Sequence, residues 1–287
     1  MNNQATLSDL LFDVEMVDTE EFTGIPANSD YSKLIVGTID GQQTILNACS
    51  NRYELVPNST IFPNIRQVLI DNGMQFTENY QSINNARFYA DYVLEDQELA
   101  YNVGKSGDII KPRISVQHSY NGLTKYLIVF GYYRMICSNG LILPVNELKK
   151  YNLEISGKHT SSIKNSFIKL NKTIKYFADN RTQINLAIGG TFDQLAGNVV
   201  EKWEDRIVEV LNASNIVNVD NSKFSTMDYV KNVIDSEKHL YDNKVNDFLI
   251  YNSINQYLND DTLNKKTPEV RRAKDSKVFE TLLEMQS

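Results

Sequence analysis

The sequence predicts an α+β protein, with antiparallel β-hairpins and one helix in its N-terminal half and helices in its C-terminal half. Up to about residue 158, short β-branched and aromatic runs alternate with polar residues, and Gly-containing turns separate them. From about Thr160 onward, apolar residues recur at intervals of three and four instead. The chain has 287 residues, of which 41% are hydrophobic, so it is long enough to bury a full core.

Three regions follow from this change of period. Residues 1–24 have no clean period and many acids, and we expect an arm or a short helix with frayed ends. Residues 25–158 form the predicted β-rich domain. Residues 159–287 form a helical region that packs on the sheet and ends in a short tail. No run of about eighteen apolar residues occurs and no signal-peptide pattern is present, so we expect a cytoplasmic protein without a membrane span.

The β-rich region contains one clear hairpin near its start. Lys33–Ile39 and Gln43–Ala48 are predicted strands, joined by an Asp-Gly turn at Asp40–Gly41. Arg52–Val56 continues as a short strand that Pro57 ends. A helix, a strand and a Gly-containing loop are then expected over Ile61–Asn72, Arg87–Glu95 and Asn102–Asp108.

A second hairpin lies at the centre of the chain. Asn121–Gly122 predicts a two-residue turn, because both positions tolerate a positive φ. With that turn, Tyr120 would pair with Leu123, and the two strands would share one apolar face toward the core. The opposite face collects two arginines and three aromatic residues, namely Arg113, Arg134, Tyr126, Phe130 and Tyr132.

The helical region contains four longer helices. An apolar stripe from Ile163 to Phe177 defines the first helix, over Thr160–Ala178. Its solvent side carries Lys164, Lys169, Lys172 and Lys175. The remaining elements are helices over Phe192–Asn212, Ser225–Lys238 and Val245–Leu258, a basic linker over Asn264–Lys274 and a last helical turn or two at Val278–Leu283.

Charge is distributed unevenly along an acidic chain. The net charge is −7 overall, −11 over residues 1–100, +8 over residues 101–180 and −4 over residues 181–287. A basic block of this kind is typical of a surface that binds phosphates. It also fits a solvated face that balances the acidic N-terminal region, and both interpretations stay open at this point.

The basic block and the central hairpin together predict binding of single-stranded nucleic acid. Lysines and arginines would neutralise phosphates while the aromatic rings stack on bases. In the alternative interpretation, the helix over Thr160–Ala178 packs on the aromatic face, its rings belong to the core and the lysines are an ordinary exposed face. The predicted contact residues are Arg113, Lys125, Tyr126, Phe130, Tyr132, Arg134, Lys164, Lys169, Lys172 and Lys175.

The sequence predicts no catalytic, metal or cofactor site. Cys49 and Cys137 do not form a C-x-x-C pair, so a structural zinc site is not expected and both thiols are predicted to be buried fillers. His118 lies in no motif that would supply metal ligands or a catalytic triad. The glycines match neither a phosphate loop nor a dinucleotide fingerprint. We therefore expect a protein that is not an enzyme.

Three short segments, Asn47–Asn58, Ser119–Gly122 and Arg134–Leu141, resemble the phage/plasmid-like proteins of the domain-of-unknown-function 932 family. That family shows a Ser-x-x-Tyr…Asn element, a Ser-x-Asp-Gly turn and an Arg-x-x-Cys-x-Asn signature. Here Asn121 stands in place of the Asp, which leaves the turn chemistry intact. The matching residues are Ser50, Tyr53, Asn58, Ser119, Gly122, Arg134, Cys137 and Asn139. Asn252–Leu258 is similar to a further, C-terminal element of the family.

This resemblance implies a gene carried on phages or plasmids and a protein of the bacterial cytoplasm. The order of hairpins and then helices also resembles, more distantly, single-strand annealing proteins of the Rad-fifty-two and Red-beta kind. That likeness implies binding or annealing of single-stranded DNA, an accessory role in recombination and a homo-oligomer. The alternative is a structural or interaction protein, such as a virion component or a host-defence antagonist, whose acidic ends form the working surface.

Overall fold

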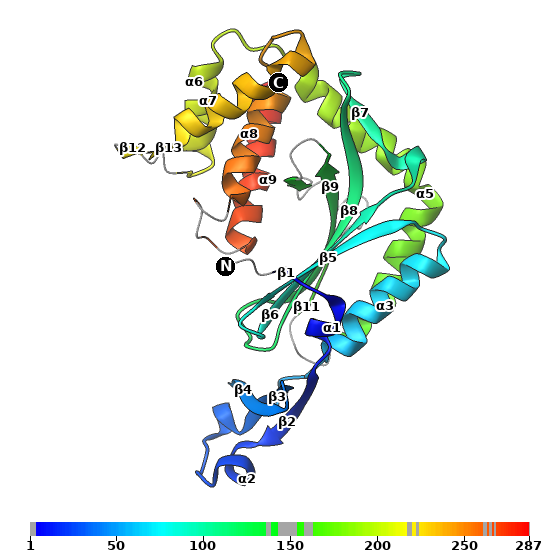
Figure 1. The fold of residues 1–287 in the computed structure, drawn as a ribbon, viewed down its shortest axis with the longest axis vertical. Coiled ribbons are helices and arrows are strands. Elements are labelled where there is room, and N and C mark those ends of the chain that lie inside the picture. Colours follow the sequence, from blue (N-terminus) through cyan, green and yellow to red (C-terminus); the bar gives the residue numbers. More distant parts are fainter. Residues whose placement is uncertain are drawn as a thin grey trace. The chain divides into compact units, whose positions relative to one another are not determined.

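The computed structural model describes residues 4–135, 139–142, 154–157, 163–216, 220–221, 224–260, 263, 266 and 268–286. Over these residues the protein is α+β, which confirms the predicted fold class, with antiparallel sheets followed by a helical C-terminal half (Figure 1). The strands are β1 Gln4–Ala5, β2 Asp13–Asp18, β3 Lys33–Ile39, β4 Gln42–Cys49, β5 Phe76–Ile83, β6 Arg87–Leu94, β7 Tyr101–Val103, β8 Asp108–Ser119, β9 Tyr126–Arg134, β10 Asn139–Ile142, β11 Glu154–Gly157, β12 Asp220–Asn221 and β13 Phe224–Ser225.

Helices make up most of the second half of the chain. The α-helices are α1 Leu7–Leu10, α2 Thr19–Thr23, α3 Asn58–Asp71, α5 Ile163–Gly197, α6 Trp203–Ala213, α7 Thr226–Glu237, α8 Asp247–Asn259 and α9 Pro268–Glu284. Short 3-10 turns are η1 Ser29–Tyr31, η2 Gln97–Leu99 and η3 Lys238–Tyr241.

The largest sheet has the strand order β1-β5-β6-β8-β9-β10, with β7 paired to β8 and β11 paired to β9. A separate three-stranded sheet has the order β2-β3-β4. Its β3–β4 hairpin turns at Asp40 and Gly41, whose φ angles are 51° and 75°. Positive φ at both positions is what the predicted Asp-Gly turn requires, so this prediction is confirmed.

The residues group into two compact units. Unit 1 consists of Met1–Asp96, Ile114–Val129 and Asn152–Asp179. Unit 2 consists of Gln97–Arg113, Phe130–Tyr151 and Asn180–Ser287. These units do not share the boundaries expected after residues 24 and 158, because β8, β9 and α5 each contribute residues to both units.

Unit 1 builds its core between α3 and the strands β5 and β6. Phe62, on the apolar side of α3, is fully buried and meets the ring of Tyr80 edge-on, with the centroids 6.0 Å apart. Tyr80 in turn packs edge-on against Tyr92 of β6, at 6.1 Å. Part of the expected N-terminal arm is a strand, since β2 pairs with β3 along its whole length.

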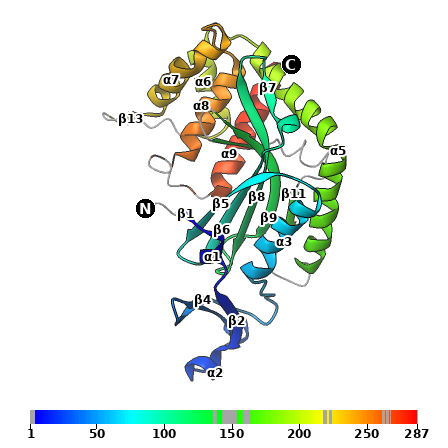
Figure 2. The same cartoon turned by 45° about the vertical axis from the view of Figure 1, so that its right-hand side comes forward.

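Unit 2 builds its core around α8, whose residues are almost all buried. Both α7 and α9 contact α8, and Figure 2 shows the three helices side by side. The ring of Phe192 meets the rings of Phe248 and Phe279, at centroid distances of 5.7 and 5.4 Å. A helix that is buried on all sides needs its polar groups satisfied internally, which α8 achieves partly through the hydrogen bonds of Asn252 and Ser253 to preceding carbonyls.

Several local predictions were wrong. The central hairpin does not turn in two residues, because Ser119 Oγ accepts the Thr124 N–H at 3.2 Å and donates to the Thr124 carbonyl at 2.8 Å, which closes a longer loop. Only Gly122 of the predicted Asn-Gly pair has a positive φ. Arg52–Val56 is not a strand, while β5 is a strand that the prediction missed, since its sequence is mostly polar.

The helix boundaries also differ from those predicted. The helices predicted over Thr160–Ala178 and Phe192–Asn212 are divided at a different place. The first helix, α5, continues to Gly197, and the next helix, α6, starts only at Trp203. The helix passes through Gly189, where a Cβ atom would lie 2.2 Å from the Tyr101 ring, so this glycine allows a close approach of the strand residue. The expected linker is partly helical, since α9 already starts at Pro268, a residue suited to a first helical position.

Candidate functional site

The exposed side of α5 carries the predicted lysines. Lys169, Lys172 and Lys175 are all exposed, whereas Ile174 and Phe177 of the same helix are buried. The three lysines are spaced by three residues, so they lie along one side of the helix over about 9 Å. The side chain of Lys164 lies outside the described residues. The amphipathic pattern of this helix is therefore confirmed where the structure describes its side chains.

No carboxylate of the described residues neutralises the charge of these lysines. None of the three forms an ion pair with a described residue. Tyr176, next to Lys175 and one turn beyond Lys172, is 43% exposed. Asp179 is exposed one turn further along and is the nearest acid on this part of the helix. We refer to Lys169, Lys172, Lys175 and Tyr176 as the α5 basic face.

The predicted aromatic platform is not on the surface. Tyr126, Phe130 and Tyr132 are exposed by 2% or less. The Tyr132 hydroxyl donates to Asn185 Oδ1 at 2.8 Å, and its ring packs edge-on against Phe192 at 5.6 Å. A base cannot stack on rings that are covered in this way, so the structure agrees with the alternative in which these aromatics belong to the core. Burial also raises the pKa of the Tyr126 and Tyr132 phenols.

Two other predicted contacts on the hairpin, Lys125 and Arg113, differ in their exposure. Lys125 is exposed, in the loop between β8 and β9. Arg113 is half-buried in the middle of β8. Neither residue is part of α5.

The first two family motifs form one cluster in unit 1. The Tyr53 hydroxyl donates to the Ser119 carbonyl at 3.4 Å, and the Asn58 N–H donates to the Tyr120 hydroxyl at 2.7 Å. Asn58 Nδ2 also donates to the Leu10 carbonyl at 2.9 Å. These bonds tie the start of α3 to the β8–β9 loop, so the motif residues hold backbone segments in place.

Two more motif positions complete this cluster. Ser50 Oγ accepts the Arg52 N–H at 3.3 Å and so shapes the turn after β4. Gly122 has a φ of 69°, and a Cβ atom there would lie 3.6 Å from Asn47 Nδ2. Of the third motif, Cys137 lies outside the described residues, and Asn139 is described only through its backbone pairing with Arg134.

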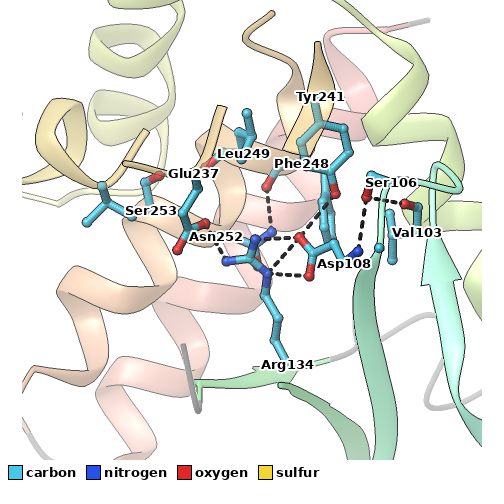
Figure 3. Close-up of polar contacts among 12 residues, drawn as sticks. Val103, Ser106, Asp108, Arg134, Glu237, Tyr241, Phe248, Leu249, Asn252 and Ser253 are labelled. Atoms are coloured by element: carbon cyan, nitrogen blue, oxygen red, sulfur yellow. Dashed lines mark hydrogen bonds and ion pairs between the residues drawn. The ribbon is translucent and has the colours of Figure 1, made fainter. Parts of the chain in front are cut away.

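Arg134, the first residue of the third motif, lies in a buried ion cluster of unit 2 (Figure 3). Its Nε lies 2.9 Å from both carboxylate oxygens of Asp108, and its Nη2 contacts Asp108 as well. Its Nη1 donates to Glu237 Oε2 at 2.6 Å. We refer to Arg134, Asp108, Glu237 and Tyr241 as the arginine cluster, since the Tyr241 hydroxyl also donates to Asp108, at 3.1 Å.

Packing around the arginine cluster excludes solvent. Arg134 and Asp108 are fully buried, and Glu237 is 7% exposed. The guanidinium carbon lies 5.8 Å from the centre of the Phe248 ring, which is a cation–π contact. Burial, and next the charge of Asp108, raise the pKa of Tyr241, so this phenol keeps its proton and remains a donor. Two carboxyl groups therefore engage an arginine that the sequence had predicted to bind phosphate.

The sequence contains little that would locate the partners of Arg134. Asp108 was expected to end a loop, and Glu237 was expected to end a helix, 103 positions away from Arg134. The one signal in the sequence is the position of Arg134 at the end of an apolar strand. An arginine that is buried there needs carboxylate partners.

The described residues do not form a metal centre. No group of three or more His, Cys, Asp and Glu side chains among them is placed to hold a metal ion. Among the helices in the described ranges, none offers an apolar stretch long enough to cross a bilayer.

The fold and these sites define an α+β protein with a structural arginine cluster and an exposed basic helix face. The chain belongs to the family described as "Domain of unknown function (DUF932)", whose model matches residues 45–277. This match confirms membership of the family that the three motifs indicated, and all three motifs lie within the matched residues. It starts within β4, so β2, α2 and β3 lie before the matched region. Comparison with curated proteins gives no match, and neither does comparison with solved structures.

Proposed function

We propose that this chain is a phage- or plasmid-encoded protein that binds single-stranded DNA through the α5 basic face, as an annealing or recombination accessory factor of the bacterial cytoplasm. One observation carries the proposal. Three exposed lysines lie along one side of a long helix, without an ion pair to any described residue, in a chain whose net charge is −7. An acidic protein that concentrates uncompensated positive charge on one helix face has a local field that attracts phosphates.

The expected mechanism differs from base stacking on the central hairpin. The lysines contact phosphates, and a base beside them stacks on the part of the Tyr176 ring that is exposed to solvent. Stacking on such a ring needs an unpaired base, which favours a single strand over a duplex. Arg134 takes no part, because its guanidinium is committed to Asp108 and Glu237. The genomic origin rests on the resemblance to the family, and the annealing role rests on the more distant resemblance to single-strand annealing proteins.

Fluorescence anisotropy with a labelled single strand and the matching duplex, titrated across salt, tests this proposal. Each phosphate contact to a single strand contributes a slope of about −0.7 to log K against log salt, so three lysines should contribute about −2. The variant K169E/K172E should bind at least tenfold more weakly and with a shallower slope.

A matched control has the same change of net charge at another place. Lys202 and Lys244 are exposed and lie outside the α5 basic face, so K202E/K244E should bind nearly as well as the wild type. Asp179→Asn should tighten binding, because it removes the acid closest to the lysines along the helix. Equal losses in both charge-reversed variants would show that only overall charge matters, and no binding at low salt would refute the function.

A further inference from the structure

The connection between β2 and β3 is far longer than the topology needs. These strands are antiparallel neighbours, which a turn of two residues can join. Here the connection runs over fourteen residues, Thr19–Ser32. Its ends meet, since the Thr19 N–H donates to the Ser32 carbonyl at 3.0 Å and the Thr19 hydroxyl donates to the Tyr31 carbonyl at 2.7 Å. Closed surface loops of this size are frequently functional.

The loop is held in shape by its own polar groups. Asp18 Oδ1 accepts the N–H of Glu20 at 3.0 Å and so caps α2. Gly24 ends this helix in the left-handed conformation, with a φ of 71°. Asn28 Oδ1 caps η1 by accepting the N–H of Asp30 at 3.0 Å and that of Tyr31 at 3.2 Å. Polar caps thus order a loop in which α2 buries no residue.

This ordered loop presents apolar side chains to solvent. Phe22, Ile25 and Tyr31 are 37%, 66% and 57% exposed. Exposed apolar side chains on an ordered surface segment indicate a contact surface.

The loop is also strongly acidic. Glu20, Glu21 and Asp30 of this loop are exposed, and residues 1–32 contain no Lys, Arg or His. Residues 1–51 have a net charge of −7, which is the charge of the whole chain, so the other residues are neutral overall. Such a surface repels nucleic acid and is complementary to a basic protein surface.

The α5 basic face is a basic surface of this kind, because it combines three exposed lysines with an exposed aromatic ring. We propose that the Thr19–Ser32 loop docks on the α5 basic face of a second copy of this chain. Glu20, Glu21 and Asp30 would meet lysines, while Phe22, Ile25 and Tyr31 would bury apolar area near Tyr176. Two different surfaces meet in this contact, so it is heterologous, and repeating it produces a ring or a filament.

The proposed contact uses the same lysines as the proposed nucleic-acid function. A second copy and single-stranded DNA therefore compete for the α5 basic face. Adding single-stranded DNA to the protein should reduce the number of copies in the assembly. The two proposals can be tested separately. Self-association is measured without DNA, and DNA binding is measured at protein concentrations too low for copies to associate.

Sedimentation velocity of the full chain at about 50 mM and about 500 mM salt tests the docking, since ion pairs are screened at the higher salt. The wild type should associate at low salt and dissociate at high salt. E20K/E21K and K169E/K172E should each associate at least tenfold more weakly. An equal mixture of the two variants should associate again, because the basic loop of one faces the acidic helix of the other.

Neutral variants separate the apolar part of the contact from the charged part. Ile25→Ser should weaken association severalfold, whereas Leu123→Ser, at a residue 72% exposed outside both surfaces, should not. Circular dichroism confirms that each variant is folded. A monomeric wild type at low salt, or a mixture of charge-reversed variants that stays monomeric, would overturn the docking. Loop variants that weaken association while α5 variants do not would also overturn it.

Discussion

Arg134 and Asp108 form a fully buried pair in which one nitrogen, Nε, lies 2.9 Å from both carboxylate oxygens. The two residues come from neighbouring strands, and Glu237 adds a second carboxyl group from the end of α7. Arg134, the first residue of the Arg-x-x-Cys-x-Asn family signature, therefore links three elements of unit 2, namely β8, β9 and α7. Its chemistry is that of a structural ion cluster, because no solvent reaches the guanidinium.

Removing Asp108 should destabilise the protein strongly. In Asp108→Asn the Arg134 guanidinium stays buried with less compensating charge, and breaking a buried pair in this way typically costs about 3–5 kcal/mol. Urea unfolding followed by tryptophan fluorescence measures the change. Lys238→Ala removes the partner of Asp235 in an exposed pair of the same unit and should change stability very little. Similar stabilities for both variants would show that the arginine cluster is not structural.

Two adjacent glycines of α5 should respond in opposite ways to alanine. In Gly189→Ala the new Cβ would lie 2.2 Å from the Tyr101 ring, and this overpacking should destabilise unit 2 by about 1–3 kcal/mol. In Gly190→Ala the Cβ meets nothing within 4 Å, so the better helix propensity of alanine should stabilise the helix by about 0.5–1 kcal/mol. Thermal unfolding of both variants gives the comparison, and two changes of the same sign would contradict it.

Substitutions of Lys172 and of Tyr176 should affect single-strand binding in different ways, because one side chain supplies a charge and the other a ring. Lys172→Ala should reduce the salt slope of single-strand binding by about 0.7, because it removes one phosphate contact. Tyr176→Ala should weaken binding by about 1–3 kcal/mol with the slope unchanged, because it removes a ring and no charge. Anisotropy titrations at several salt concentrations measure both quantities. Identical effects of the two substitutions would show that Tyr176 does not stack on bases.

Stability should decrease at alkaline pH because buried phenols keep their protons. Burial raises the pKa of Tyr80 and of Tyr101 to about 12, above the ordinary tyrosine value of about 10. Below a pH of about 10, the folded and unfolded chains both hold these protons, and the free energy of unfolding does not depend on them. Between about 10 and 12, the unfolded chain loses protons that the folded chain retains, so the free energy of unfolding falls.

Urea unfolding at a series of alkaline pH values measures this loss of stability. Tyr101→Phe removes one of the groups and should make the decrease less steep, while also losing the hydrogen bond to Asp193. A free energy of unfolding that stays constant up to a pH of about 11 would show that these phenols ionise equally in both states.

Local sequence determined the elements whose formation depends on nearby residues. The β3–β4 turn follows from Asp40 and Gly41, because both residues accept a positive φ. The limits of α7 and α8 follow from their apolar periods and from the capping side chains of Ser225 and Asn246. The exposed lysines of α5 follow from the same period, and the family membership followed from short motifs.

Tertiary structure alone decided which surfaces are covered. Alternation along β9 predicted one face in the core and one at the surface, yet Tyr126, Phe130 and Tyr132 are buried because both faces of this strand are covered. The same holds for Arg134, which binds a carboxylate 103 positions away instead of a phosphate. Turns and helices depend on neighbours within a few residues, whereas burial depends on distant segments that no local pattern identifies.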